Sequence, residues 1–261
     1  MEDRRFRLIP HKLSRRSALL GTVCALASHE ARAFGGAGAF HPRALKVGGK
    51  GLDNARADAP ARWAWELVRR TSAPARIVTT MVAADQPSLL TEPFVIWAGS
   101  TEVAPLTQSE VRGLRQFLKL GGVMIVDDSE PGGGPFGKSV RRELARVLPE
   151  APVVKLESTH VIFKTYYIID RPVGRGLGPP QVEAIVRGKN AQVVLLSHDL
   201  LGALARRQDG WALQVEPGGE KQRQYAIRLA VNLAMYVLCS DYKDDQVHAP
   251  WLMRRRARQR H

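Results

Sequence analysis

Six side chains of this sequence are of the types that bind ligands or move protons. They are Asp127, Asp128, His160, Tyr166, His198 and Asp199. Carboxylate oxygens combined with one or two imidazoles can hold a divalent metal ion or activate a water molecule. These six residues are therefore the candidates for ligand binding. The pattern assigns no catalytic residue, no metal ligand and no cofactor, although it leaves room for a divalent metal.

Asp127 and Asp128 close the stretch of chain that is easiest to interpret. A helix beginning at the capping box Thr107-Gln-Ser-Glu110 runs into Gly121-Gly122, and four apolar residues then precede the aspartates. Glycine ends a helix well because it adopts the left-handed conformation at no steric cost. A short apolar run of this kind indicates a strand buried on both faces, as in a parallel sheet. Ligands of open α/β sheets bind at the carboxyl ends of strands, so the two aspartates lie where a site is expected.

The remaining candidates occupy two later segments. His198 and Asp199 directly follow a predicted strand over 192–197, which the turn at 188–190 joins to another strand over 182–187. His160 and Tyr166 belong to the segment 158–167. Sequence spacing does not establish that these groups meet. An aspartate after a strand also commonly caps the next turn or helix, and a single histidine is often a hydrogen-bonded structural residue.

The elements that position these residues alternate between strands and helices. Further strands are predicted over 44–47, 76–82 and 92–98. Helices are predicted over 58–70, with Asp58 as its cap, over 136–148 and over 222–238. Strands separated by helices favour parallel pairing through right-handed crossovers. The predicted fold class is α/β, flavodoxin-like, with a mostly parallel central sheet and helices on both faces.

The first 33 residues have the three parts of an export signal. A basic segment with the pair Arg15-Arg16 precedes Leu19-Leu20 in an apolar region, and Ala31-Arg-Ala33 supplies small residues for cleavage. The paired arginines are typical of a twin-arginine signal. We expect cleavage after Ala33 and export to the periplasm or cell envelope. The alternative is a basic amphipathic helix that stays attached. Residues 34–245 then form a single α/β domain, and residues 246–261 form a basic C-terminal tail.

The charge of the chain is concentrated at its two ends. The formal net charge is +14; the first 33 residues carry +4 of it and the last eleven residues contribute five Arg, which leaves about +5 for the body. This distribution argues against nucleic acid as a partner. The tail is expected to be solvated, with contact to an anionic surface as the alternative. After removal of the signal only Cys239 remains, so an internal disulfide is excluded.

Four short motifs in a fixed order resemble an uncharacterised bacterial family, the domain of unknown function four-one-five-nine. They are Gly121-Gly122 with Asp127-Asp128, His160-x-x-Phe163 with Tyr166-Tyr167, Ser197-x-Asp199-Leu200, and Asn232 with the segment 242–248. The resemblance covers roughly residues 40–250. It implies the class I glutamine amidotransferase-like fold. It implies no activity, because the family has no established one.

The chemistry of that fold class is not expected here. Amidotransferase catalysis needs a nucleophile on a strand-to-helix elbow, and the sequence has neither Gly-x-Cys-x-Gly nor Gly-x-Ser-x-Gly. We expect an exported, non-catalytic binding or accessory domain of the cell envelope, with a small ligand or an envelope protein at the C-terminal edge of the sheet. The alternative is a metal-assisted or acid/base hydrolase that uses Asp127, Asp128, His160 and His198. The sequence identifies neither the ligand nor the oligomeric state.

Overall fold

A seven-stranded, mostly parallel sheet forms the centre of the protein. The computed structural model describes residues 38–188 and 190–258, and it describes side chains as far as residue 240. The predicted export signal therefore lies outside the described residues. The strands are β1 (Arg43–Lys46), β2 (Thr80–Ala83), β3 (Phe94–Gly99), β4 (Val123–Asp128), β5 (Val153–Lys155), β6 (Glu183–Arg187) and β7 (Asn190–Leu196).

The order of the strands is β2-β1-β3-β4-β7-β6-β5. Strands β2, β1, β3, β4 and β7 pair in parallel, and β6 and β5 extend the sheet in antiparallel fashion. The five parallel strands reproduce the 2-1-3-4-5 order of flavodoxin-like sheets. The α/β fold with a mostly parallel sheet that the sequence predicts is confirmed.

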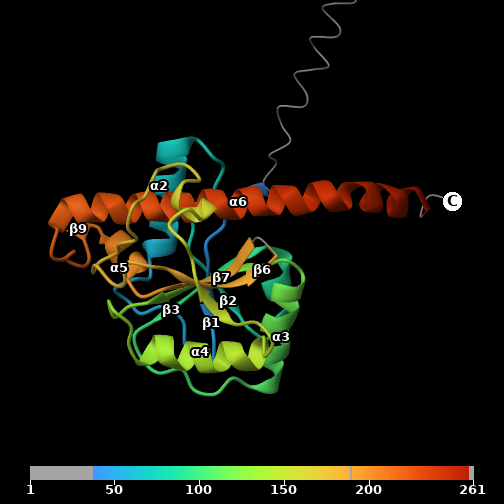
Figure 1. Cartoon of the computed structure of the whole chain (residues 1–261), viewed down its shortest axis with the longest axis horizontal. Helices are drawn as coiled ribbons and strands as arrows, with labels where there is room; N and C mark the ends of the chain where they lie inside the picture. The colour runs from blue at the N-terminus through green and yellow to red at the C-terminus, as the bar shows by residue number, and fades with distance from the viewer. Residues whose placement is uncertain (1–37, 189, 259–261) are drawn as a thin grey trace, which may run out of the picture. The chain divides into compact units, whose positions relative to one another are not determined.

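Five α-helices among the described residues cover the two faces of the sheet (Figure 1). Helices α2 (Ala59–Thr71), α5 (Leu200–Leu204) and α6 (Gly219–Arg258) pack on one face. Helices α3 (Gln108–Lys119) and α4 (Pro135–Val147) pack on the other. The minor elements are the 3-10 turns η3 (Pro87–Thr91) and η4 (Val161–Phe163) and the short hairpin of β8 (Arg206–Arg207) and β9 (Gly210–Trp211). None of the helices in the described part of the chain combines the length and apolar character that a bilayer crossing requires.

Strand β4 divides its apolar side chains between the two cores. Val123 and Ile125 pack with the core beneath α2, α5 and α6, whereas Met124 and Val126 pack with the core above α3 and α4. The alternation follows because successive side chains of a strand point to opposite faces of a sheet. Every residue of β4 is buried. The predicted strand, the capping box of α3 and the left-handed Gly121 (φ 93°) are confirmed.

Three local predictions are wrong in detail. Asp58 stands at the N-cap position of α2, but its side chain makes no capping hydrogen bond. The strand predicted over 76–82 is observed only over Thr80–Ala83. Before β2 begins, Arg76 donates its N–H to the carbonyl of Phe40, and Val78 donates its N–H to the carbonyl of Arg76 in a tight turn. Helix α6 runs beyond its predicted end at residue 238 to Arg258, so the helix enters the predicted tail.

Candidate functional site

Asp127 and Asp128 are adjacent in β4 and therefore point to opposite faces of the sheet. Both side chains are about 1% exposed. Asp127 continues the row of Val123 and Ile125 toward α5, and Asp128 continues the row of Met124 and Val126 toward α4. The two carboxylates thus serve two separate elements instead of forming one paired acid.

Asp127 caps the start of the short helix α5. Its Oδ1 accepts the backbone N–H of Leu200 (2.9 Å), and its Oδ2 accepts that of Leu201 (2.7 Å). Burial, together with the nearby negative charge of Asp199, raises the pKa of Asp127 to about 8, against an ordinary value of 3.8. A carboxyl group that is protonated at neutral pH fits this site, because a second full negative charge beside Asp199 would be costly.

Asp128 organises the glycine-rich loop that leads into α4. Its Oδ1 accepts the N–H of Glu130 (3.0 Å), and its Oδ2 accepts those of Gly134 (2.7 Å) and Gly137 (3.0 Å). A Cβ atom on Gly137 would lie 2.4 Å from Oδ2 of Asp128, so a larger residue there would displace the carboxylate. Asp128 therefore supplies the cap that Gly134, at the N-cap position of α4, cannot supply itself.

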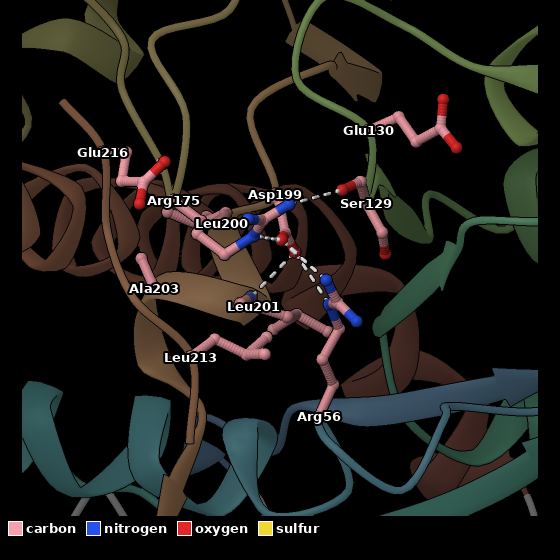
Figure 2. A network of polar contacts seen from close by, with 12 residues as sticks. Arg56, Ser129, Glu130, Arg175, Asp199, Leu200, Leu201, Ala203, Leu213 and Glu216 are labelled. Carbon is pink, nitrogen blue, oxygen red and sulfur yellow. Dashed lines mark hydrogen bonds and ion pairs between the residues drawn. The ribbon is translucent and has the colours of Figure 1, made fainter. Parts of the chain in front are cut away.

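Asp199 lies between two arginines, as Figure 2 shows. Its oxygens accept Nε (2.7 Å) and Nη2 (2.6 Å) of Arg56, Nε of Arg175, and the N–H of Gly202. Burial alone would lower the pKa of Arg56, but the hydrogen bonds and charge of Asp199 raise it above its ordinary value. The bidentate Arg56 contact compensates a carboxylate that is fully buried.

His198 anchors a loop that passes over the edge of the sheet. Its Nδ1 accepts the N–H of Ser197 (3.2 Å), so Nε2 carries the proton and donates it to the carbonyl of Pro179 (2.8 Å). Burial lowers the pKa of His198 below its ordinary value, despite this contact with Pro179. A neutral imidazole with both nitrogens engaged fixes the position of the 171–180 loop.

His160 belongs to a different part of the fold. Its Nδ1 accepts the N–H of Ile162 at the start of η4, and its ring packs 6.1 Å from that of Tyr236 on α6. The hydroxyl of Tyr236 donates to Ala191 at the beginning of β7, whereas His198 follows the end of the same strand. Within the described part of the chain, His160 shares no contact with the three aspartates.

Tyr166 also lies apart from the aspartates. It is 47% exposed, its hydroxyl donates to the carbonyl of Arg70 at 2.7 Å, and its ring packs edge-on against Tyr167. The fully buried Asn232 of α6 accepts the N–H groups of Tyr166 and Tyr167. The structure thus brings Asp127, Asp128, His198 and Asp199 to one edge of the sheet and places His160 and Tyr166 beside α6.

A cleft of about 410 Å³ opens at the C-terminal edge of β4 and β7. Its walls come from the glycine-rich loop and first turns of α4, the loop held by His198, and the ends of β5, β6 and β7. They include Asp128, Gly132, Gly133, Gly137, Lys138, Arg141, Lys155, Pro179, Pro180, Gln181, Glu183, Leu195 and Ser197. The volume falls within the usual range for ligand pockets. Of the six predicted residues, only Asp128 lines it.

The functional candidates that the sequence did not reveal are basic. Lys138, Arg141 and Lys155 line the cleft, and Arg56 and Arg175 neutralise Asp199. One signal was present for the first group: Lys138 and Arg141 are three residues apart on a helix that starts beside Asp128, so they share a face. Arg56 gives no local signal, because 143 residues separate it from Asp199.

Two kinds of site were sought among the described residues: a group of metal ligands and a nucleophile on a strand-to-helix elbow. Among the residues that the structure describes, no group of three His, Cys, Asp or Glu side chains could hold a metal ion. Cys239 is an exposed free thiol on α6, not a residue on a strand-to-helix elbow. The geometry therefore offers a charged cleft and a set of internally satisfied acids.

These features define an α/β domain with a mostly parallel sheet and a cleft at the C-terminal edge of its strands. Residues 43–238 match the family described as "Domain of unknown function (DUF4159)". The match covers most of the chain, so the chain belongs to this family, as its motif order predicts. No curated protein matches the chain.

Proposed function

We propose that this protein is a non-catalytic binding or accessory domain of the cell envelope whose ligand occupies the cleft beside Asp128. The observation that carries the proposal is the contrast between the cleft and the acids next to it. The cleft is open and lined by side chains from several elements. The three aspartates at the same edge are buried and hold the surrounding backbone in place.

The acids have little capacity left for chemistry. Both oxygens of Asp127 accept N–H groups of α5, and Asp128 accepts three N–H groups of its loop. Asp199 is enclosed by two guanidinium groups. A general base must reach the proton that it removes within hydrogen-bond distance or through one water. These contacts support a structural role, in which the aspartates shape the edge that binds the ligand.

The alternative is an acid/base hydrolase at this edge, and one observation favours it. The pKa of Asp127 is raised to about 8, and strongly perturbed acids are frequent at active sites. Asp127 is about 1% exposed, however, and does not line the cleft. Structural networks of buried charges also perturb pKa values, so we rank binding above hydrolysis.

The proposed location at the envelope rests on the sequence of residues 1–33 alone, with its paired arginines and its small residues before Phe34. The partner is an unknown small ligand or an envelope protein. We also propose, from the sequence alone, that the Arg-rich C-terminal end can make a peripheral contact with an anionic surface.

A screen of thermal stability with neutral and charged small molecules tests the proposal, because a ligand that binds the folded state raises Tm. We expect some members of the panel to raise the Tm of the full chain and to lose this effect in Ser197→Phe, which fills the cleft. Gln181→Trp, at the exposed rim, provides a second block. Panel effects that persist in both variants would place the ligand elsewhere. Turnover of chromogenic esters or phosphoesters that both variants abolish would contradict the non-catalytic role.

A further inference from the structure

We infer that the cleft binds the oxyanion of a phosphorylated or carboxylated small molecule, held by Lys138, Arg141 and Lys155. This inference rests on the proposed function, since it names the class of ligand for the same cleft. The three cations come from two different elements, α4 and β5, and all three line the cavity.

Two of the cations have no internal partner. Neither Lys138 nor Lys155 forms an ion pair or side-chain hydrogen bond with any residue that the structure describes. Lys155 ends β5 directly opposite Glu183 of β6, yet the Glu183 carboxylate contacts Nη2 of Arg141 instead (2.5 Å). Opposed residues of an antiparallel pair have Cβ atoms about 5 Å apart. Arg141 therefore forms the ion pair with Glu183, and the ammonium group of Lys155 has no ion-pair partner among the described residues.

The acids of the cleft do not cancel this charge. Glu183 forms an ion pair with Arg141. The carboxylate of Asp128 accepts hydrogen bonds from three backbone N–H groups of the glycine-rich loop and the start of α4. Lys138 and Lys155 are exposed to solvent and have no ion-pair partner among the described residues, and they line the same concave site. Charges of one sign gathered in a cleft attract an anion of the opposite sign. The backbone N–H groups of Gly134 and Gly137 are already bound to Asp128, so the inference depends on the side chains and not on the helix terminus.

The remaining walls accommodate the uncharged body of the ligand. Pro179 and Pro180 form one side, and Leu195 adds an apolar surface. His198 fixes Pro179 through its carbonyl, so this wall has a defined position. A mixture of apolar walls and a few convergent polar groups is typical of sites for small organic ligands. The cleft therefore suits a small molecule with one anionic end better than a free inorganic ion.

The test is calorimetric titration of the full chain with a matched set of probes: glucose, glucose 6-phosphate, glucuronate and inorganic phosphate. We expect at least one charged probe to bind and glucose to bind at least tenfold more weakly. Since a hydrogen bond to a charged group contributes enough for about a tenfold change in affinity, Lys138→Ala and Lys155→Ala should each weaken binding roughly tenfold. Lys221→Ala, an exposed lysine on α6 outside the cleft, should leave binding unchanged. The phosphate and carboxylate probes distinguish the two oxyanions.

Two results would overturn the inference. One is glucose binding as tightly as its charged counterparts, and the other is charged-probe binding that survives the double variant Lys138→Ala/Lys155→Ala. The absence of binding by all charged probes at millimolar concentration would also overturn it. A neutral molecule from the thermal screen that Ser197→Phe excludes would then preserve the proposed function while this inference fails. If Ser197→Phe alters the binding of no molecule, charged or neutral, the proposed function fails with it.

Discussion

At the scale of single residues, the three aspartates at the sheet edge have the same side chain but different partners. Asp127 and Asp128 are neighbours, but strand geometry sends one to α5 and the other to the loop before α4. Asp199 lies between two arginines, and burial together with the nearby charge of Asp199 raises the pKa of Asp127. The acids therefore behave as a set whose members stabilise different segments of one edge.

Removing the charge of Asp199 should destabilise the fold strongly. In Asp199→Asn, Arg56 and Arg175 lose the negative charge that they share, and the amide NH2 puts a donor where one acceptor oxygen was. Because Arg56 remains buried, we expect a loss of about 3–5 kcal/mol in the free energy of unfolding. Urea unfolding measures this loss. Asp53→Asn is the matched control, because Asp53 also contacts Arg56 but is 41% exposed and should contribute at most about 1 kcal/mol. Equal losses in the two variants would contradict the buried-pair assignment.

The raised pKa of Asp127 predicts a dependence of stability on pH. The folded state keeps this proton up to about pH 8, whereas the unfolded chain releases it near 3.8. The contribution of the group is therefore complete below the unfolded pKa and is lost as pH rises through the folded pKa. The stability of the wild type relative to Asp127→Asn should fall between pH 5 and 8, by at most about 1.4 kcal/mol per pH unit. Urea unfolding of both proteins measures it; a constant difference would refute the shift.

At this scale the sequence predicts residue types and positions, but not their partners. Asp127, Asp128 and His198 are identifiable because each follows an apolar run that ends at a strand terminus. The opposite orientations of Asp127 and Asp128 also follow from the sequence, because successive side chains of a strand point to opposite faces of the sheet. The contacts of Arg56 and Arg175 are not, because they depend on loops whose course is set by tertiary packing. For the same reason the separation of His160 from the aspartates could not be foreseen.

At the scale of secondary-structure elements, a buried asparagine joins η4 and its following loop to α6. Nδ2 of Asn232 donates to the carbonyls of Ile162 (3.1 Å) and Tyr167 (2.8 Å), and Oδ1 accepts the N–H groups of Tyr166 and Tyr167. All the hydrogen-bonding capacity of the amide is used. Two of the segments on which the predicted resemblance rests, separated by more than sixty residues, therefore meet in one contact.

Replacing this asparagine should release the loop. Asn232→Leu leaves four backbone groups without their side-chain partner, one in a buried hydrogen bond and three in partly buried ones, so we expect a loss of about 3 kcal/mol in the free energy of unfolding. Faster hydrogen exchange at residues 162–167 should accompany it. Gln224→Leu on the same helix provides the control, since Gln224 bonds at the surface with Glu220 and Arg70 and should change stability by less than about 1 kcal/mol. A similar effect of both substitutions would contradict the anchoring role.

The elements differ in how well their sequences predict them. β4 is predicted correctly because four consecutive apolar residues between glycines and acids have few alternative structures. β5 gives no comparable signal: it has three residues, all exposed, and exists through its pairing with β6. The continuation of α6 to Arg258 is not predictable from the sequence, because its polar residues lack the apolar period of residues 222–238.

At the scale of the whole molecule, the fold has two cores separated by one sheet, with its candidate site at the sheet edge. The order of alternating elements was sufficient to predict this architecture, because right-handed crossovers allow few arrangements. The cleft could not be predicted in the same way. Its walls are loops and strand ends, and their separation depends on long-range contacts such as that of His198 with Pro179.

Processing of the whole chain provides another prediction. If residues 1–33 form a cleaved export signal, the mature protein begins at Phe34. Mass spectrometry of the exported protein should find this N-terminus, and replacement of Arg15 and Arg16 by Lys should reduce export through the twin-arginine route. Exported protein that retains Met1 would contradict cleavage. Unaltered export of the lysine variant would contradict the twin-arginine assignment.

Locating a bound ligand tests the central claim most directly. Hydrogen–deuterium exchange of the full chain should be measured with and without the tightest-binding molecule of the thermal screen. The account predicts slower exchange at 130–138 and 181–183, the segments that form the cleft with Pro179 and Pro180, and no change at 160–167 beside α6. Protection confined to 160–167, with the cleft unaffected, would contradict the assignment of the binding site.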